Sequence, residues 1–99
     1  MNDYLLLMHA DVPTGAADPA HTWPAYFARL RAAGAFEGGS AIGGGVCVSR
    51  AGARADIARH LTGYIRLRAE SLEAAQALLA GNPVYEAGGT VEIRELPPG

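Results

Sequence analysis

Two histidines and a nearby aspartate are the residues of this sequence best suited to acid–base chemistry near neutral pH. His9 and Asp11 follow a short apolar run near the amino terminus, and His60 directly precedes a second, alternating run. An unperturbed histidine titrates near neutrality, and a carboxylate within hydrogen-bond reach fixes its tautomer and raises its basicity. We therefore expect His60 or His9 to act as the base of a proton transfer, with Asp11 orienting it.

An arginine and several other polar residues are expected near the same place. Arg66 lies on the alternating run that begins after His60, and a guanidinium can hold a carboxylate through two parallel hydrogen bonds. The ligand implied by this group is a small organic acid. Further side chains expected at this edge are His21, Asn82, Tyr85 and Glu86.

The same residue types also have plainer interpretations. A histidine at a strand end is commonly a surface or capping residue, and Arg66 can pair with Glu92 across strands with modest energy. Trp23 and Phe27 recur at helical spacing, which favours a place in the core over a cofactor platform. The histidines lack the spacing of a recognised metal site, so we expect neither a metal nor a cofactor.

Composition and charge restrict the class of protein. The 99 residues suit a single domain over residues 1–99, and 49% of them are hydrophobic, as in globular chains. The net charge of −2 provides no basic surface for nucleic acid or an anionic membrane, so neither is expected as a partner. The single Cys47 cannot form an internal disulfide, and no export or anchor signal is recognised. We therefore expect a cytoplasmic protein.

The pattern of apolar residues predicts the elements that must position these side chains. Residues 4–8 are apolar on both faces, which is typical of a strand covered on both sides, and residues 61–68 alternate. Helices are predicted over 22–34 and 71–81, each opened by a capping hydroxyl and closed by a glycine. Residues 49–59 have no clear pattern. Further extended segments are predicted at 36–42, 46–48 and 90–94, with a bend at 43–45.

The resulting order is β-α-β-β-α-β, an α+β arrangement of the ferredoxin-like kind. Its antiparallel sheet has strand order 4132, with two helices on one face. The other face is left bare, and a second copy of the chain is the partner expected to cover it, which gives a homodimer. We expect Leu6 on this sheet-to-sheet face, where an introduced charge would disrupt association. The polar side chains expected to line or rim the space between the sheets are Tyr64, Arg66, Glu92 and Arg94. The alternative is a monomer whose sheet faces water.

Five segments resemble the YCII-related (DGPF-type) domains. They are Tyr4-Leu5-Leu6-Leu7-Met8, the stretch from Ala33-Gly34 to Gly38-Gly39, Gly63-Tyr64, Asn82-Pro83, and Gly89-Thr90-Val91-Glu92-Ile93-Arg94. The resemblance covers nearly the whole chain and implies a dimeric α+β barrel. It also implies that only a few members are enzymes, acting on muconolactone-like or chlorinated ring-cleavage acids.

The chain departs from that family where its enzymes have their acid–base couple. The family implies a histidine on the first helix and an aspartate after the second, but the matching positions here are Tyr26 and Asn82. A tyrosine titrates near pH 10 and an asparagine does not titrate, so this pair cannot shuttle protons near neutrality. Tyr26 and Asn82 are therefore candidates for ligand contact, together with Tyr85 and Arg66. The DGPF stretch is also absent from residues 53–60.

Two functions of different class remain open. The first is a non-catalytic dimeric module that binds a small organic acid or serves as an accessory domain, which the two substituted family positions favour. The second is a cofactor-independent enzyme of the isomerase or dehydrohalogenase type, with His60 or His9 as its base. The two are discriminated by whether His9, His60 and Asp11 converge in a concave pocket.

Overall fold

A computed structural model describes residues 1–15, 22–54 and 58–99 of the chain. The strands are β1 (Asn2–His9), β2 (Phe36–Ala41), β3 (Cys47–Ser49), β4 (Gly52–Arg54), β5 (Leu61–Ala69) and β6 (Val91–Leu96), and the helices are α1 (Trp23–Ala32), α2 (Leu72–Ala77) and α3 (Pro83–Glu86). Among the described helices, none is both long and apolar enough to cross a membrane.

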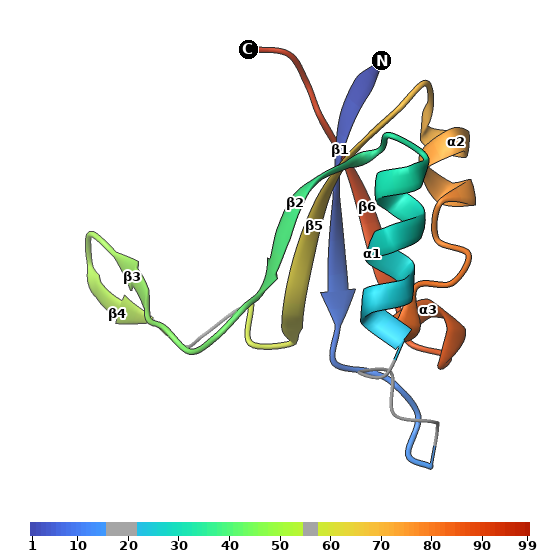
Figure 1. Cartoon of the computed structure of the whole chain (residues 1–99). Helices are drawn as coiled ribbons and strands as arrows, with labels where there is room; N and C mark the ends of the chain where they lie inside the picture. The colour runs from blue at the N-terminus through green and yellow to red at the C-terminus, as the bar shows by residue number, and fades with distance from the viewer. Residues whose placement is uncertain (16–21, 55–57) are drawn as a thin grey trace.

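Four antiparallel strands form one sheet in the order β2-β5-β1-β6. The helices lie on one side of this sheet (Figure 1). The predicted α+β class and the 4132 strand order are therefore confirmed. The sheet is open within one chain and does not close into a barrel.

The core lies between the sheet and the helices, and strand alternation decides which residues enter it. On β1, Leu6 pairs with Ile65 of β5 and Ile93 of β6 and is 0% exposed on the helix-facing side. The predicted place of Leu6 on the open face is therefore wrong. Because this strand is apolar on both faces, alternation alone did not indicate which set of residues faces the helices. The buried core residues are Tyr4, Leu6, Met8, Tyr26, Leu30, Ile65, Leu67, Ala69, Ala75, Leu79 and Val84.

The opposite side of the sheet carries a half-buried apolar strip with charged neighbours. Leu5 lies between Arg66 and Arg94 in the ladder, and Leu7 lies between Tyr64 and Glu92. We call the surface formed by these six residues the outer face. The polar residues predicted for this face are indeed on it, and Leu5 and Leu7 take the place predicted for Leu6.

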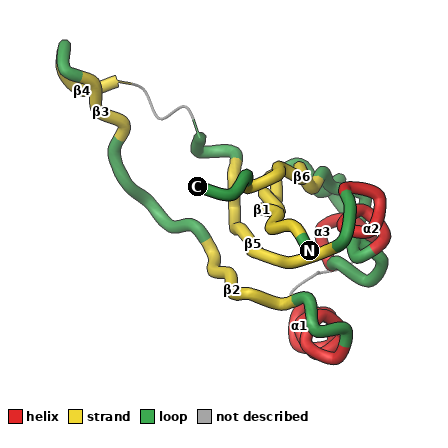
Figure 2. The backbone as a smooth tube through the Cα atoms, turned by 90° about the horizontal axis from the view of Figure 1, so that it is seen from above, coloured by secondary structure: helices red, strands yellow, loops and turns green. Residues whose placement is uncertain are grey.

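A small hairpin extends beyond β2. Strands β3 and β4 pair only three residues each, and Gly52, the first residue of β4, has a φ of +130°, which favours glycine. We call residues 42–54 the arm; it extends away from the helices (Figure 2). The sequence predicted extended chain for 46–48 but no strand at β4.

The second predicted helix corresponds to α2, and a further short helix, α3, follows where the sequence predicted a helix stop. Gly81 has a φ of +88°, and Asn82 then caps α3 with its side-chain oxygen. Pro83 was expected to end a helix, but it begins α3, because the first helical position needs no backbone N–H.

Candidate functional site

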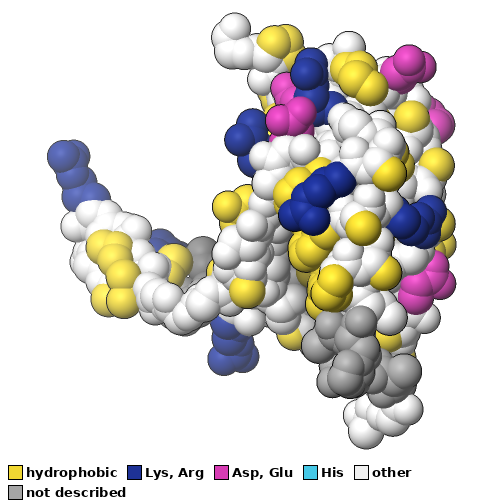
Figure 3. Space-filling view, in the orientation of Figure 1, with side chains coloured by type: hydrophobic (Ala, Val, Ile, Leu, Met, Phe, Trp, Pro, Cys, Tyr) yellow, Lys and Arg dark blue, Asp and Glu magenta, His cyan; other side chains and the backbone are white. Residues whose placement is uncertain are grey.

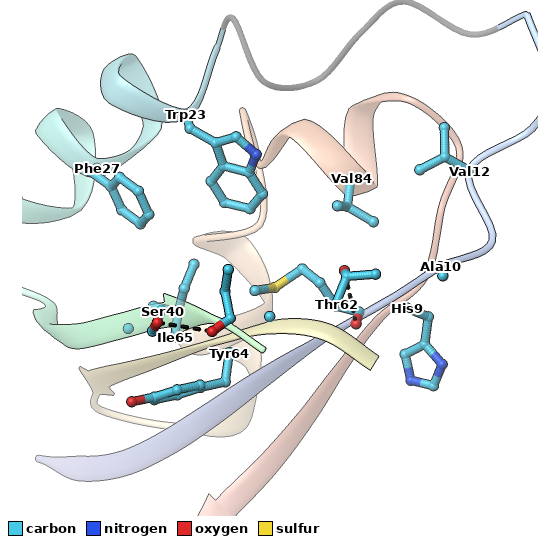
Figure 4. Close-up of a pocket in the computed structure, with 14 residues that line it drawn as sticks. His9, Ala10, Val12, Trp23, Phe27, Ser40, Thr62, Tyr64, Ile65 and Val84 are labelled. Atoms are coloured by element: carbon cyan, nitrogen blue, oxygen red, sulfur yellow. Dashed lines mark hydrogen bonds between the residues drawn. The ribbon is translucent and has the colours of Figure 1, made fainter. Parts of the chain in front are cut away.

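A cavity of about 590 Å³ opens between α1 and the sheet (Figure 4). Its lining is mainly apolar, and two hydroxyl side chains reach it. Ser40 Oγ donates to the Ala41 carbonyl at 2.9 Å, and Thr62 Oγ1 donates to the Met8 carbonyl at 3.4 Å. The apolar side chains that line it are Met8, Val12, Trp23, Phe27, Ile65 and Val84.

Two aromatic rings of α1 form the wall opposite the sheet. Trp23 and Phe27 are four residues apart and therefore share one face of the helix. Their ring centroids are 5.5 Å apart at an interplanar angle of 26°, and Phe27 also contacts Phe36 of β2 with centroids 5.3 Å apart. Both rings pack on the core, as the sequence predicted, but their exposed parts line the cavity.

Small residues of the sheet leave the space that the cavity occupies. Ala41 and Gly63 align with Met8 across three strands on the helix-facing side. A Cβ atom at Gly63 would lie 3.3 Å from Met8 Cε, and one at Gly39 would lie 2.6 Å from the Tyr64 carbonyl oxygen. Larger side chains at these positions would fill the space or separate β2 from β5.

A second group of polar side chains lies where β1 ends and β6 begins. The His9 and His60 rings are 5.0 Å apart between centroids, and His9 Nε2 lies 3.0 Å from Glu92 Oε1. The other Glu92 oxygen accepts from Arg94 Nε at 2.6 Å. These hydrogen bonds, first that of Arg94 and then that of His9, hold the pKa of Glu92 below its usual value. We call His9, His60, Glu92 and Arg94 the histidine cluster.

Asp11 is close to this cluster but has a different role from the one expected. One carboxylate oxygen accepts from the Thr90 backbone N–H at 2.7 Å, and the other accepts from the Thr90 hydroxyl. These bonds lower the pKa of Asp11. Asp11 therefore ties the end of β1 to the start of β6, and the carboxylate in contact with His9 belongs to Glu92. The sequence alone did not indicate that contact, because it depends on the register between β1 and β6.

The histidine cluster and the cavity are separate. His9 is at the rim of the cavity, but its ring points away from Trp23 and Val84 (Figure 4). His60 and Asp11 are exposed and do not line the cavity. Among the described residues, the acid–base groups of the histidine cluster therefore lie outside the space that the cavity encloses.

A model of the YCII-related domain matches residues 4–98. The chain belongs to the YCII-related domain family. Its fold is similar to that of the 5-chloro-2-hydroxyhydroquinone dehydrochlorinase TftG from Burkholderia phenoliruptrix AC1100, whose structure is a complex with 2,5-dihydroxybenzoquinone. The two chains are 15% identical, the TM-score is 0.61, and the match covers 98% of this chain and 95% of that one. It is also similar to At3g17210 from Arabidopsis thaliana, with 16% identity, a TM-score of 0.50, and coverage of 100% and 96%. No curated protein matches the chain.

In this YCII-related domain, the two positions matched to the family's acid–base couple are buried next to one another. Tyr26 is 1% exposed and donates its hydroxyl to the Leu78 carbonyl at 2.8 Å. Burial raises the pKa of Tyr26, and interaction with the Asn82 side chain only partly opposes this rise. Asn82 is 0% exposed, and its Nδ2 has no hydrogen-bond partner among the described residues. Neither residue lines the cavity; Tyr26 joins α1 to the end of α2, and Asn82 caps α3.

The remaining candidates lie apart from the cavity. Arg66 is exposed on the outer face, and Tyr85 is exposed on α3. Glu86 accepts from the Gly81 N–H at 2.9 Å. His21 lies outside the described residues. Within the described part of the chain, no three histidine, cysteine or carboxylate side chains are grouped so that they could hold a metal ion.

Proposed function

We propose that this YCII-related domain is a non-catalytic module that binds a small, flat and largely apolar ring compound between α1 and the sheet. The cavity is the observation that carries the proposal, since about 590 Å³ is within the range of small-molecule sites. Trp23 and Phe27 offer ring faces for stacking. None of the described residues that line the cavity is an arginine, a lysine or a carboxylate. A neutral ring therefore suits the cavity better than the organic acid expected from the sequence.

Trp23 provides a direct test, because it is the only tryptophan of the chain and lines the cavity. The indole N–H signal in a proton–nitrogen NMR spectrum is followed during titration with hydroquinone and, separately, with benzoate. We expect a saturable shift with hydroquinone and a weaker response to benzoate, because the carboxylate would lose its hydration without gaining a charged partner.

A pair of variants locates the binding. Ala41→Phe places a ring in the cavity from the sheet side, whereas Ala77→Phe adds the same ring to an exposed position of α2. We expect Ala41→Phe to abolish the saturable shift and Ala77→Phe to retain it. Identical titrations of both variants and the wild type would show that the cavity is not the binding site.

The alternative function is a cofactor-independent enzyme that transfers a proton, of the isomerase or dehydrohalogenase type. It is favoured by the contact between His9 Nε2 and Glu92 at 3.0 Å, which would orient His9 as a base beside His60. The fold neighbour from Burkholderia phenoliruptrix is itself a dehydrochlorinase. If the alternative holds, the wild type releases chloride from 5-chloro-2-hydroxyhydroquinone, and Glu92→Gln slows the release about 100-fold. A wild type that releases no chloride would exclude this dehydrochlorinase activity.

We further propose that the domain acts as a homodimer joined through the outer face. Leu5 and Leu7 give this face an apolar centre, and both signs of charge flank it, with Arg66 on one side of β1 and the Glu92–Arg94 ion pair on the other. A surface with both signs of charge can meet itself across a twofold axis without net repulsion. The cytoplasmic location expected from the single cysteine stays a prediction.

A further inference from the structure

The arm presents an uncovered apolar surface. The side chains of Val46 and Val48 are 86% and 69% exposed. No helix or other strand of the described chain packs extensively on β3 or β4. Hydrophobic side chains are visible on the surface of the arm, at the left of the space-filling view (Figure 3).

The two sides of the hairpin differ in chemistry. Val48 lies directly opposite Ala53, and Val46 precedes it by two residues, so alternation places the valines on one side. Cys47 lies opposite Arg54 on the other side. A two-stranded hairpin by itself is only marginally stable in water, and these strands have three residues each. The valine side therefore needs a covering surface to keep the arm ordered.

We propose that the valine side of the arm packs on a second copy of this chain and extends the interface of the outer face. This inference rests on the proposed homodimer. The arm extends away from the helices, and so it lies on the side of the sheet that carries the outer face (Figures 1 and 2). In a twofold dimer, each arm would clasp the partner reciprocally.

Charge favours a second copy as the occupant. Residues 42–54 contain Arg50 and Arg54 but no carboxylate, whereas the whole chain has a net charge of −2. The remainder of the chain is therefore more acidic than its total suggests. Arg54 lies on the side away from the valines, so it is Arg50, in the turn between β3 and β4, that can approach a carboxylate of an identical chain through this contact.

Two neighbouring substitutions with the same new charge test the arm. Val48→Asp places a carboxylate on the valine side, and Ser49→Asp places one on the other side, as alternation requires. Sedimentation velocity over a concentration series gives the dimer dissociation constant. We expect Val48→Asp to raise it about 10-fold or more, and Ser49→Asp to change it about twofold at most.

Cys47 gives an independent readout, because it is the only cysteine and lies in the arm on the side away from the valines. A nitroxide label on Cys47 reports the mobility of the arm by electron paramagnetic resonance. We expect a restricted label in the wild-type dimer and a mobile one in Leu7→Asp, which separates the chains through the outer face without touching the arm.

The outcomes distinguish the arm from the dimer. A dimer that Leu7→Asp dissociates but Val48→Asp does not, with equal label mobility in both states, would overturn the arm contact and leave the outer-face dimer standing. A wild type that is monomeric at all concentrations would overturn both. The ligand titration of Trp23 would still report on the cavity in either case.

Discussion

At the scale of single residues, the Asn82 side chain determines how the chain enters α3. Its Oδ1 accepts from the N–H groups of Val84 at 3.0 Å and Tyr85 at 3.1 Å, while its own backbone stays extended. Two backbone donors that have no partner within the helix are thus satisfied by a fully buried side chain. Since Val84 lines the cavity, this cap also positions part of the proposed site.

Replacing Asn82 with alanine therefore removes a buried cap. We expect Asn82→Ala to lower the free energy of unfolding by about 1–2 kcal/mol, since both N–H groups lose their acceptor and that of Val84 is buried away from water. The loss of Nδ2, which has no hydrogen-bond partner within the described ranges, offsets part of the effect. Urea denaturation measures the change.

Ser71→Ala is the control. Ser71 is half-exposed and caps α2 by accepting one hydrogen bond from Ala74 N at 3.1 Å, so we expect a smaller loss of unfolding free energy than for Asn82→Ala. An equal or larger loss in the control would contradict the buried role of Asn82.

At the scale of elements, the strands and helices of the main body were predictable because their patterns are long. Residues 61–68 alternate over eight positions, and that pattern fixed the side of the sheet for Ile65, Arg66 and Leu67. Strand β4 was not predictable, because Gly52, Ala53 and Arg54 are too few to show a period. Helix α3 was missed for a related reason, since Pro83 can either stop a helix or begin one.

The cavity was beyond sequence reasoning for a different physical reason. Trp23 and Phe27 have the spacing of core residues, and nothing in their types shows that part of each ring remains uncovered. The space itself arises from small residues on two other strands, Ala41 and Gly63, which only the register aligns opposite α1. The contact between His9 and Glu92 likewise depends on pairing between strands 83 residues apart in sequence. The cavity and this contact both depend on the register between strands, and the sequence alone does not give that register.

At the scale of the whole molecule, a new charge on one side of β1 should destabilise the fold, whereas a new charge on the other side should dissociate the dimer. Leu6 is fully buried against the helices, whereas Leu7 is half-buried on the outer face. We expect Leu6→Asp to destabilise the fold by about 3–5 kcal/mol, since it leaves an unpaired charge in the core. Leu7→Asp should stay folded and become monomeric, because its charge is buried only when two outer faces meet.

Circular dichroism melting and light scattering on both variants separate these effects. If the dimer forms through the outer face, Leu7→Asp retains a cooperative unfolding transition at half the wild-type mass, while Leu6→Asp melts at a much lower temperature. A Leu7→Asp variant with the wild-type mass would show that the outer face is free in solution, as in an antiparallel sheet with one solvated side. In that case the apolar strip of Leu5 and Leu7 would need another explanation, and the proposed contact between the arm and a second chain would be wrong.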